Sequence, residues 1–311
     1  MRIAIFGAGG VGGYLGARLV QAGHDVAFIA RGKHLHAIRH TGLRISSPHG
    51  DALLQDLEAT DDPGQVGPVE AVIVTLKTWQ LAESVQSVRP LVDAQSLVLP
   101  LLNGVEASDL LAAELGDQIL LKGAIKILSY VEAPGHIRHL PPVPIIDFGE
   151  RDSTQTGRVA RLAVALASAG LKAQTPADID VALWSKFLLV VSSGGVGAVT
   201  RAPFGVYRSI PETREMTRQA MQEIYAVARA RGVALPESSV DDAMTFFDSL
   251  PEEGTTSLQR DIAEGRRSEL EAWNGAVVRM GRDAGVPTPV HEVIYRSLLP
   301  LELKAQDRLV W

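Results

Sequence analysis

The amino-terminal stretch RIAIFGAGGVG, residues 2–12, decides the fold of the first half of the chain. Its apolar start, Arg2 to Phe6, predicts a strand, and Gly12 to Ala22 has the apolar spacing of a helix. The glycines between them fit the pattern G-x-G-x-x-G in the strand-to-helix context that indicates dinucleotide binding rather than a tight turn. Glycines let backbone N–H groups approach a pyrophosphate, and a helix N-terminus favours its charge. We therefore expect cofactor contacts from Gly7, Ala8, Gly9, Gly10, Val11 and Gly12.

The rest of the first half continues the alternation of strands and helices. Further strands are expected at Asp25–Ala30, Val69–Leu76 and Ser96–Leu101, and a helix at Gln80–Val92. The last two strands are nearly continuous in Val, Ile and Leu, which is typical of strands buried on both faces of a parallel sheet. A β-rich tail around Pro134-Gly135 and a helix at 158–169 follow. The pattern predicts a doubly wound α/β domain over residues 1–176.

The second half of the chain shows helical patterns and no convincing strand. Helices are expected at 178–193, 209–231, 258–280 and 291–303, the third with a possible break at Gly265. Ser209 and Glu212 suggest a capping box for the second of these helices. The change of class predicts an all-helical domain over residues 177–311.

Composition narrows the class of protein. The 311 residues carry a formal net charge of -6, so there is no basic excess for nucleic-acid binding. The chain has no cysteine, which excludes disulfides, iron–sulfur clusters and thiol nucleophiles. No uncharged apolar stretch is long enough to span a membrane, since the best candidate, 181–199, contains Lys186 and three glycines. We expect a soluble cytoplasmic protein without nucleic-acid or membrane partners.

The residues after the second expected strand bear on the choice of cofactor. NAD-binding domains usually place Asp or Glu about 20 residues after the glycine loop, to hold the ribose 2′-hydroxyl. This chain has Ala30, Arg31, Gly32 and Lys33 there. Two cations would favour a 2′-phosphate, so the motif predicts NADP(H) over NAD(H). The alternative is that both cations belong to a solvated loop.

Two polar residues follow expected parallel strands. Lys77 comes directly after Val69–Leu76, and Asn103 shortly after Ser96–Leu101. Ligands of open α/β sheets bind at the carboxyl ends of the strands, which favours a functional role for both. The alternatives are a solvated lysine and a simple Asn-Gly turn.

Lys186 and Glu269 are the ionisable residues that stand out in the helical half. Lys186 lies in ALWSKFLLVV, which is apolar nearly all round. Burial would lower the pKa of its ammonium group and suit it to act as a general acid, although spacing alone favours a lysine that reaches water. Glu269 either shares an apolar helix face or, if Gly265 ends that helix, lies near the start of a new one capped by Ser268.

The chain's histidines predict no metal site. His34, His36 and His40 lie in a basic stretch, and His136 and His139 flank a turn without further ligands. We interpret all five as surface residues.

Several motifs, in order along nearly the whole chain, resemble the ketopantoate reductase (2-dehydropantoate 2-reductase) family. They are GAGGVG, Lys77, LLNGV around Asn103, PGHIRH at 134–139, WSKF around Lys186 and TSLQRDIAEGRRSELEAWNG at 256–275. The resemblance implies a Rossmann-type domain followed by a helical domain like the 6-phosphogluconate dehydrogenase C-terminal domain. It also implies NADPH-dependent reduction of 2-dehydropantoate to (R)-pantoate in pantothenate biosynthesis.

The resemblance also assigns roles to individual residues. It makes Lys186 the proton donor, which also contacts the substrate, and Glu269 a functional acid near the nicotinamide. It places Asn103 near both cofactor and substrate, Lys77 on the cofactor, and Ser257 on the substrate carboxylate. By the same resemblance, Arg31 binds the 2′-phosphate of the cofactor.

The sequence departs from the family pattern at two positions. The family usually has asparagines four and eight residues after the catalytic lysine, where this chain has Val190 and Gly194. A site that loses hydrogen-bonding partners changes its choice of substrate. The substrate could therefore be another 2-oxo acid or a ketone. A non-catalytic NADP(H)-binding sensor is a third possibility, although binding alone would not need Lys186 and Glu269. A homodimer is a possible assembly.

Overall fold

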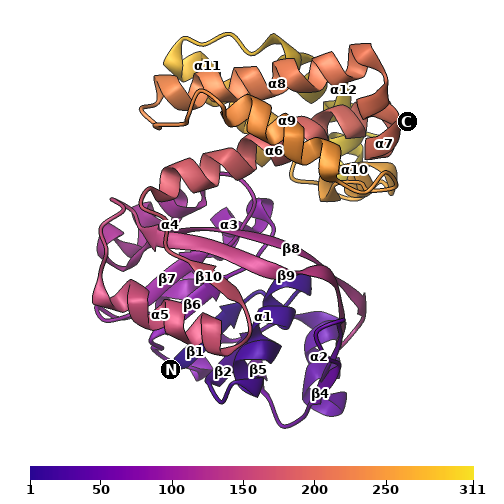
Figure 1. Cartoon of the computed structure of the whole chain (residues 1–311). Helices are drawn as coiled ribbons and strands as arrows, with labels where there is room; N and C mark the ends of the chain where they lie inside the picture. Colours follow the sequence, from indigo (N-terminus) through magenta and orange to yellow (C-terminus); the bar gives the residue numbers. More distant parts are fainter. The chain divides into compact units, whose positions relative to one another are not determined.

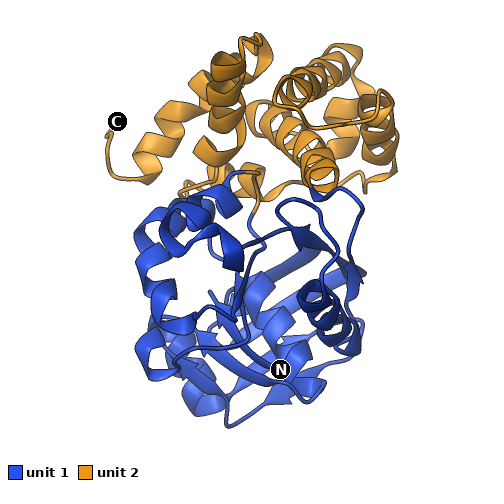
Figure 2. Ribbon diagram, turned by 90° about the vertical axis from the view of Figure 1, so that its left-hand side faces the viewer, with its two compact units in different colours: residues 1–102, 106–179 blue, residues 103–105, 180–311 orange.

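The computed structural model describes residues 1–311, which form two compact units (Figure 2). Unit 1 contains residues 1–102 and 106–179, and unit 2 contains residues 103–105 and 180–311. The sequence predicts a boundary at 176/177, and contacts divide the chain at 179/180. The short segment 103–105 groups with unit 2 although it lies far from the rest of that unit in the sequence.

Unit 1 contains a parallel five-stranded sheet in the order β5-β2-β1-β6-β7 (Figure 1). Its strands are β1 (Arg2–Phe6), β2 (Asp25–Ile29), β5 (Glu58–Thr60), β6 (Ala71–Val74) and β7 (Leu97–Pro100). Because β1 pairs in parallel with β2 and β6, the carboxyl ends of these three strands lie at one edge. Ligands of such sheets bind at this edge, where the strand order reverses. The predicted doubly wound α/β domain is confirmed.

Helices bury both faces of this sheet. They are α1 (Gly10–Gln21), α2 (Gly32–Thr41), α3 (Thr78–Ser84, continued by a 3₁₀ segment Val85–Leu91), α4 (Ala107–Leu115) and α5 (Gly157–Ser168). Alternate residues of β1 enter different cores: Ile3 and Ile5 belong to one buried cluster, and Ala4 and Phe6 to another. This alternation is why the strands carry an almost unbroken apolar sequence.

A second sheet of unit 1 is built on a long hairpin. Its strands are β3 (Leu43–Ser46), β4 (Ala52–Leu54), β8 (Leu121–Ala133), β9 (His136–Glu150) and β10 (Lys172–Gln174). β8 and β9 pair antiparallel, and β9 pairs in parallel with β3 and β10. The β-rich tail expected from the sequence is this hairpin, turned at Gly135 with φ of 74°.

Two of the histidines interpreted as surface residues are not on the surface. His139 is buried at 1% exposure, and its Nδ1 lies 3.0 Å from Ser47 Oγ. The Gly135 N–H donates to Nδ1 of the half-buried His34 at 3.0 Å. Burial lowers the pKa of both imidazoles. The surface interpretation is therefore wrong for these residues, because the long hairpin covers them.

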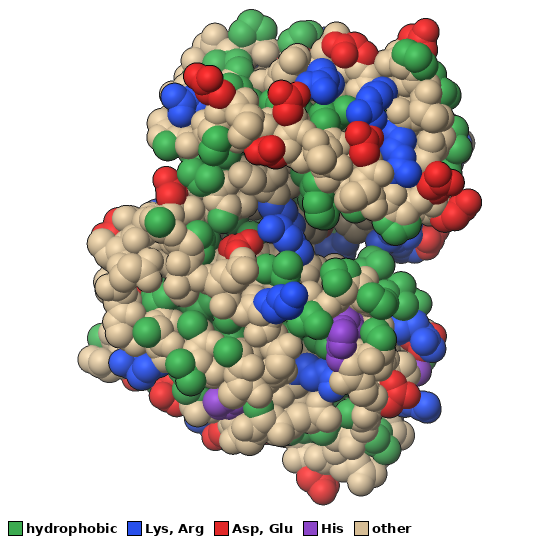
Figure 3. Space-filling model, viewed as in Figure 1, with side chains coloured by type: hydrophobic (Ala, Val, Ile, Leu, Met, Phe, Trp, Pro, Cys, Tyr) green, Lys and Arg blue, Asp and Glu red, His purple; other side chains and the backbone are tan.

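Unit 2 is all-helical, as the sequence predicted. Its helices are α6 (Ile179–Thr200), α7 (Phe204–Ser209), α8 (Pro211–Ala230), α9 (Ser239–Ser249), α10 (Ser257–Ala263), α11 (Ala276–Ala284) and α12 (Pro289–Ala305), with a π turn at Glu271–Gly275 before α11. Acidic and basic side chains are interspersed on the face of this unit shown in Figure 3.

The central helix α6 is the longest of unit 2. By length and composition alone it could cross a membrane, and 67% of its apolar window is buried inside the structure. Buried core helices pass the same test. Trp184, Phe187, Leu188 and Val191 of this helix belong to the apolar core of unit 2. The all-round apolar pattern therefore reflects packing against other helices.

The start of α8 differs from the sequence prediction. Ser209 ends α7 and donates its hydroxyl to the Val206 carbonyl at 2.8 Å, so it does not cap α8. Helix α8 begins at Pro211 after Ile210, with no side-chain cap. The predicted capping box is wrong because the residues before Pro211 form a separate short helix.

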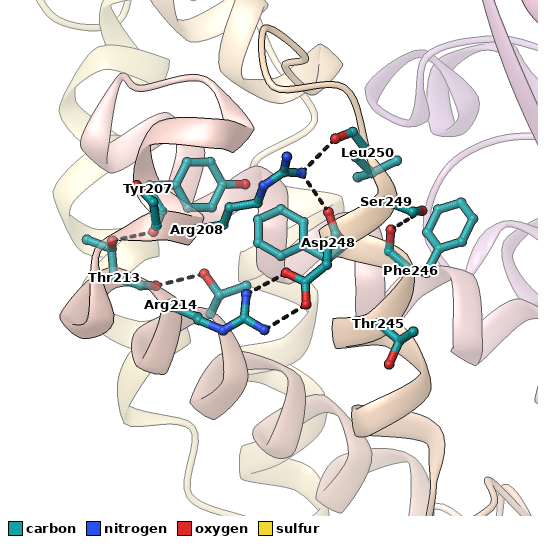
Figure 4. Close-up of polar contacts among 12 residues, drawn as sticks. Tyr207, Arg208, Thr213, Arg214, Thr245, Phe246, Asp248, Ser249 and Leu250 are labelled. Atoms are coloured by element: carbon teal, nitrogen blue, oxygen red, sulfur yellow. Dashed lines mark hydrogen bonds and ion pairs between the residues drawn. The ribbon is translucent and has the colours of Figure 1, made fainter.

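Polar side chains tie α7, α8 and α9 together (Figure 4). Arg214 on α8 forms a two-point ion pair with Asp248 on α9, with Nη2 2.8 Å from Oδ2. Arg208 on α7 donates to the Phe247 and Leu250 carbonyls at the end of α9, at 3.1 and 2.6 Å. The Arg208 contacts supply donors to carbonyl groups at the C-terminal end of α9, where a helix lacks partners for them.

Candidate active site

The three motif glycines of the loop between β1 and α1 have different structural reasons to be glycine. Gly7 has φ of 104°, a conformation that L side chains rarely adopt. A Cβ on Gly12 would lie 2.3 Å from both the Gly7 carbonyl oxygen and Thr75 Oγ1, so this glycine allows α1 to pack closely on the sheet. A Cβ on Gly9 would meet nothing within 4 Å. Gly9 therefore leaves open space at the start of α1.

The N-terminus of α1 has the chemistry of an anion site. Gly9 is its N-cap and offers no side-chain cap, and the first turn contains no acidic residue. The first N–H groups of a helix lack partners within the helix, and the helix dipole favours a negative charge there. With the open space at Gly9, these features fit the pyrophosphate of a dinucleotide.

The other loop residues serve the fold. Ala8 is buried, and its N–H donates to the Ile29 carbonyl at 3.1 Å. A Cβ on Gly10 would lie 2.7 Å from Tyr130 Cα, because β8 crosses the start of α1 there. Val11 packs beside the core that contains β1. Any cofactor contact from these three residues is therefore through the backbone.

Arg31 and Lys33 lie at the carboxyl end of β2, the same edge of the sheet as the glycine loop. Arg31 is the N-cap of α2. Both side chains are exposed, and neither has an ion-pair partner within the chain. No acidic residue occupies the position that would hold a ribose 2′-hydroxyl.

Lys77 follows β6 at this edge and is the N-cap of α3. Its N–H donates to Gln80 Oε1 at 3.1 Å, which anchors the start of that short helix. The neighbouring Thr75 donates its hydroxyl to the Gly7 carbonyl at 2.7 Å. The loop that carries Lys77 is thus joined to the glycine loop.

Unit 2 brings three of the predicted site residues together in a hydrogen-bonded chain. Lys186 Nζ on α6 donates to Asn103 Oδ1 at 3.0 Å, and Asn103 Nδ2 donates to Glu269 Oε2 at 3.1 Å. An amide can accept only through its oxygen and donate only through its nitrogen, so the two charged partners determine its orientation. The amide thus links an ammonium group to a carboxylate.

The position of Glu269 depends on the segment after α10. That helix ends at Ala263, and Gly265 has φ of 66°, so the break considered in the sequence analysis occurs. Ser268 Oγ then accepts the Leu270 N–H at 3.2 Å. The Ser268 N–H donates to Glu302 Oε2 on α12 at 3.0 Å. Glu269 therefore stands just before the π turn, on a segment held by buried hydrogen bonds.

The head group of Lys186 is held by Asn103, and its side chain is half-buried. The hydrogen bond to Asn103 therefore argues against the alternative in which the Lys186 ammonium group contacts only bulk water. A lysine with an ordered ammonium can donate a proton to an oxygen that gains negative charge. The Asn103 amide and the Glu269 carboxylate orient that donor.

The predicted substrate residue Ser257 is the first residue of α10, next to its N-cap Thr256. Ser257 forms no hydrogen bond with the three linked residues. Thr256 lies against α6 at Gly194: its Oγ1 would be 3.3 Å from a Cβ at that position. Residues 186, 190 and 194 share one face of α6, since their spacing is four residues.

Trp273 also lies near this face, and the sequence assigns it no role in the site. A Cβ on Gly194 would lie 2.6 Å from Trp273 Cζ3, so the indole fills the space beside that glycine. The ring is 1% exposed. Its spacing of four residues from Glu269 predicts that the two residues share a helix face.

Comparison with known proteins gives one consistent family. The family described as "Ketopantoate reductase PanE/ApbA" matches residues 3–153, and its C-terminal domain matches residues 178–302. A 2-dehydropantoate 2-reductase of Mesorhizobium japonicum is 30% identical, over 94% of this chain and 95% of that protein. An uncharacterized oxidoreductase of Bacillus subtilis, YkpB, is 27% identical over 96% of this chain and 98% of its own length.

Solved structures show the same fold. A PanE/ApbA family ketopantoate reductase from Ralstonia eutropha has a TM-score of 0.89 and 32% identity, covering 98% of this chain and 100% of its own. D-mandelate dehydrogenase, solved with NADH and anilino(oxo)acetate, has a TM-score of 0.89 at 22% identity, covering 98% of this chain and 99% of its own. At that identity the second likeness shows the fold alone.

Proposed function

Because the chain belongs to the ketopantoate reductase family, we propose that this oxidoreductase reduces the carbonyl group of a 2-oxo acid to a hydroxyl group with NADPH. The observation that supports this most directly is the hydrogen-bonded chain Lys186–Asn103–Glu269. It provides an oriented proton donor, which reduction of a carbonyl group requires.

NADPH would supply the hydride for the reaction when bound. The open backbone at Gly9 and the uncapped start of α1 suit its pyrophosphate. Arg31 would bind the 2′-phosphate with Lys33 nearby, since both cations are exposed at the correct edge of the sheet. We also assign Lys77 to the cofactor. Asn103 would contact both cofactor and substrate.

Lys186 would donate its proton to the carbonyl oxygen as negative charge develops there. Asn103 would hold the ammonium group in place through its Oδ1, and Glu269 would hold the amide. Glu269 would thereby orient the donor. Ser257 would bind the substrate carboxylate.

Relatives named 2-dehydropantoate 2-reductase make 2-dehydropantoate the first substrate to test. Its product would be (R)-pantoate, and the reaction would then serve pantothenate biosynthesis. Val190 and Gly194 favour a second candidate, a related 2-oxo acid, because they place no amide on the Lys186 face of α6. The homodimer stays a prediction.

The variant Lys186→Ala tests the proton donor. We expect kcat for 2-oxo acid reduction to fall about 10²- to 10⁴-fold, the usual contribution of a general acid. NADPH binding, followed by quenching of cofactor or protein fluorescence, should persist. Lys172→Ala, an exposed lysine of β10, is the matched control and should keep full activity. Near-normal turnover of Lys186→Ala would remove the assigned role.

The variant Arg31→Ala tests the cofactor assignment. We expect the KM for NADPH to rise about tenfold, the effect of losing one charge-assisted contact to phosphate. The KM for NADH should hardly change, since NADH has no 2′-phosphate. An equal response of the two cofactors would contradict the assignment.

A further inference from the structure

The Lys186 face of α6 has an unusual composition beyond the lysine. One turn after Lys186 it presents Val190, which is half-buried and packs beside the apolar core of unit 2. Two turns after Lys186 it presents Gly194, which has no side chain. Ser193 also lies on this face, but it is 2% exposed and its hydroxyl already donates to the Leu189 carbonyl at 2.7 Å. The face therefore offers no amide group and no free hydroxyl donor within two turns of Lys186.

Trp273 occupies the space that the absent side chain of Gly194 would otherwise leave open. The indole ring lies with its Cζ3 and Cε3 atoms 2.6 and 3.2 Å from the position of a Cβ on Gly194. These atoms belong to the hydrocarbon edge of the indole, opposite its Nε1. The space that a side chain at 194 would need is thus filled by a hydrocarbon surface. Compared with a polar side chain at this position, Gly194 makes the helix face less polar but leaves no additional space for a substrate.

The remaining polar group near Gly194 belongs to Thr256. Its Oγ1 accepts the Gln259 N–H at 3.2 Å and so caps α10. Thr256 precedes Ser257, to which we assign the substrate carboxylate. This end of the face therefore suits the carboxylate, and Val190 suits the carbon chain of the acid.

From this arrangement we infer that the preferred substrate is a 2-oxo acid whose substituent is a compact branched hydrocarbon without a hydroxyl group. The inference rests on the proposed function and narrows its substrate. A hydroxyl placed against Val190 would lose water without gaining a partner, which costs binding. A flat aromatic substituent would need space that Trp273 occupies.

Two acids that differ by one hydroxyl group test the inference. 2-Dehydropantoate is 4-hydroxy-3,3-dimethyl-2-oxobutanoate, and 3,3-dimethyl-2-oxobutanoate is the same acid without the hydroxyl. The full-length protein is assayed by NADPH oxidation with each acid and with benzoylformate, an aromatic 2-oxo acid. We expect kcat/KM for the deoxy acid to exceed that for 2-dehydropantoate at least tenfold, with benzoylformate below the deoxy acid.

Variants at Val190 and Trp273 test whether these two residues cause the substrate preference. Val190→Asn adds an amide one turn after Lys186 and should shift the ratio at least tenfold towards 2-dehydropantoate. Val199→Asn makes the same change at a valine of α6 that is 37% exposed, and should leave the ratio unchanged. Trp273→Leu opens space at Gly194 and should raise the ratio of benzoylformate to the deoxy acid. A merely structural role of Trp273 would lower all three rates in proportion.

The outcomes separate this inference from the proposed function. Reduction with a preference for 2-dehydropantoate, or for benzoylformate, would overturn the inference and leave the proposed function in place. An unchanged ratio in Val190→Asn would overturn the assignment to Val190. No reduction of any of the three acids by a protein that binds NADPH would remove the proposed function itself.

Discussion

The tetrapeptide Gly-Gly-Val-Gly occurs twice in this chain, at 9–12 and at 194–197, and the two copies have different structural roles. In the first copy, Gly9 stands at the start of α1, where a Cβ would meet nothing within 4 Å. In the second copy, Gly194 lies inside α6 against Trp273, and Gly195 lies against Asn274. Within the first copy, Gly9 leaves open space at a helix start, whereas Gly194 and Gly195 in the second copy let bulky side chains approach the middle of a helix.

The comparison shows why a glycine motif needs its context. Each glycine inside a helix costs about 1 kcal/mol relative to alanine, so the second copy weakens α6 unless close packing compensates. At the first copy no such packing exists at Gly9, and an uncapped helix start remains available. A strand before the motif and a helix after it distinguish the two cases.

The largest effect is expected within the first copy. Gly12→Ala would place a Cβ 2.3 Å from a carbonyl oxygen and from Thr75 Oγ1, so we expect a loss of about 3 kcal/mol or more in the stability of unit 1. Gly9→Ala would meet no atom, so it should change stability by less than about 1 kcal/mol while weakening NADPH binding. Calorimetry and NADPH titration measure the two effects.

The two alanine variants are each other's control, since both make the same chemical change three residues apart. Equal destabilisation by both variants would contradict the open space around Gly9. Full NADPH affinity of Gly9→Ala would likewise contradict the pyrophosphate assignment.

The core around the second copy should be sensitive to pH. Asn274, which packs on Gly195, donates to Nδ1 of the fully buried His291, whose Nε2 donates to the Ala220 carbonyl. Burial lowers the pKa of His291 from 6.5 to about 4. Between these values the unfolded chain binds more protons than the folded chain. Stability is therefore complete above pH 6.5 and is lost as the pH falls towards 4, by up to about 3 kcal/mol.

Urea unfolding followed by tryptophan fluorescence measures this loss, because three of the four tryptophans, Trp184, Trp273 and Trp311, lie in unit 2. Burial raises the pKa of the neighbouring Glu223, which acts in the opposite direction. The control is His291→Gln, which keeps Glu223 and removes the imidazole. If the variant loses stability with falling pH as steeply as the original chain, His291 does not cause the effect.

A smaller effect than that of Gly12→Ala is expected from Gly194→Ala. The new methyl group would meet the Trp273 ring at 2.6 Å, and overpacking of this kind costs about 1 to 2 kcal/mol. The smaller side chain of Trp273→Leu should relieve most of that cost in the double variant. A double-mutant cycle by thermal unfolding measures the coupling, and strictly additive effects would contradict a direct contact.

Local pattern was enough to predict most elements of the fold. Apolar runs and glycines predicted β1, α1, β2, β6 and β7 to within a few residues, because each element has its own periodicity. The short strands β3, β4, β5 and β10 were not predicted, since they lack the continuous run of Val, Ile and Leu that marks the equally short β6 and β7. The capping box at Ser209 was wrong because a local motif does not show which of two adjacent helices a residue joins.

Chain order and residue type alone determined that unit 1 carries a dinucleotide-type loop and that Lys186 sits in an apolar helix. Only the tertiary structure decided that Asn103 groups with unit 2 and joins Lys186 to Glu269, because that amide contacts partners 83 and 166 residues away. It also decided that Trp273 fills the space at Gly194. Contacts between residues so distant along the chain depend on how helices pack, and no local pattern contains that information.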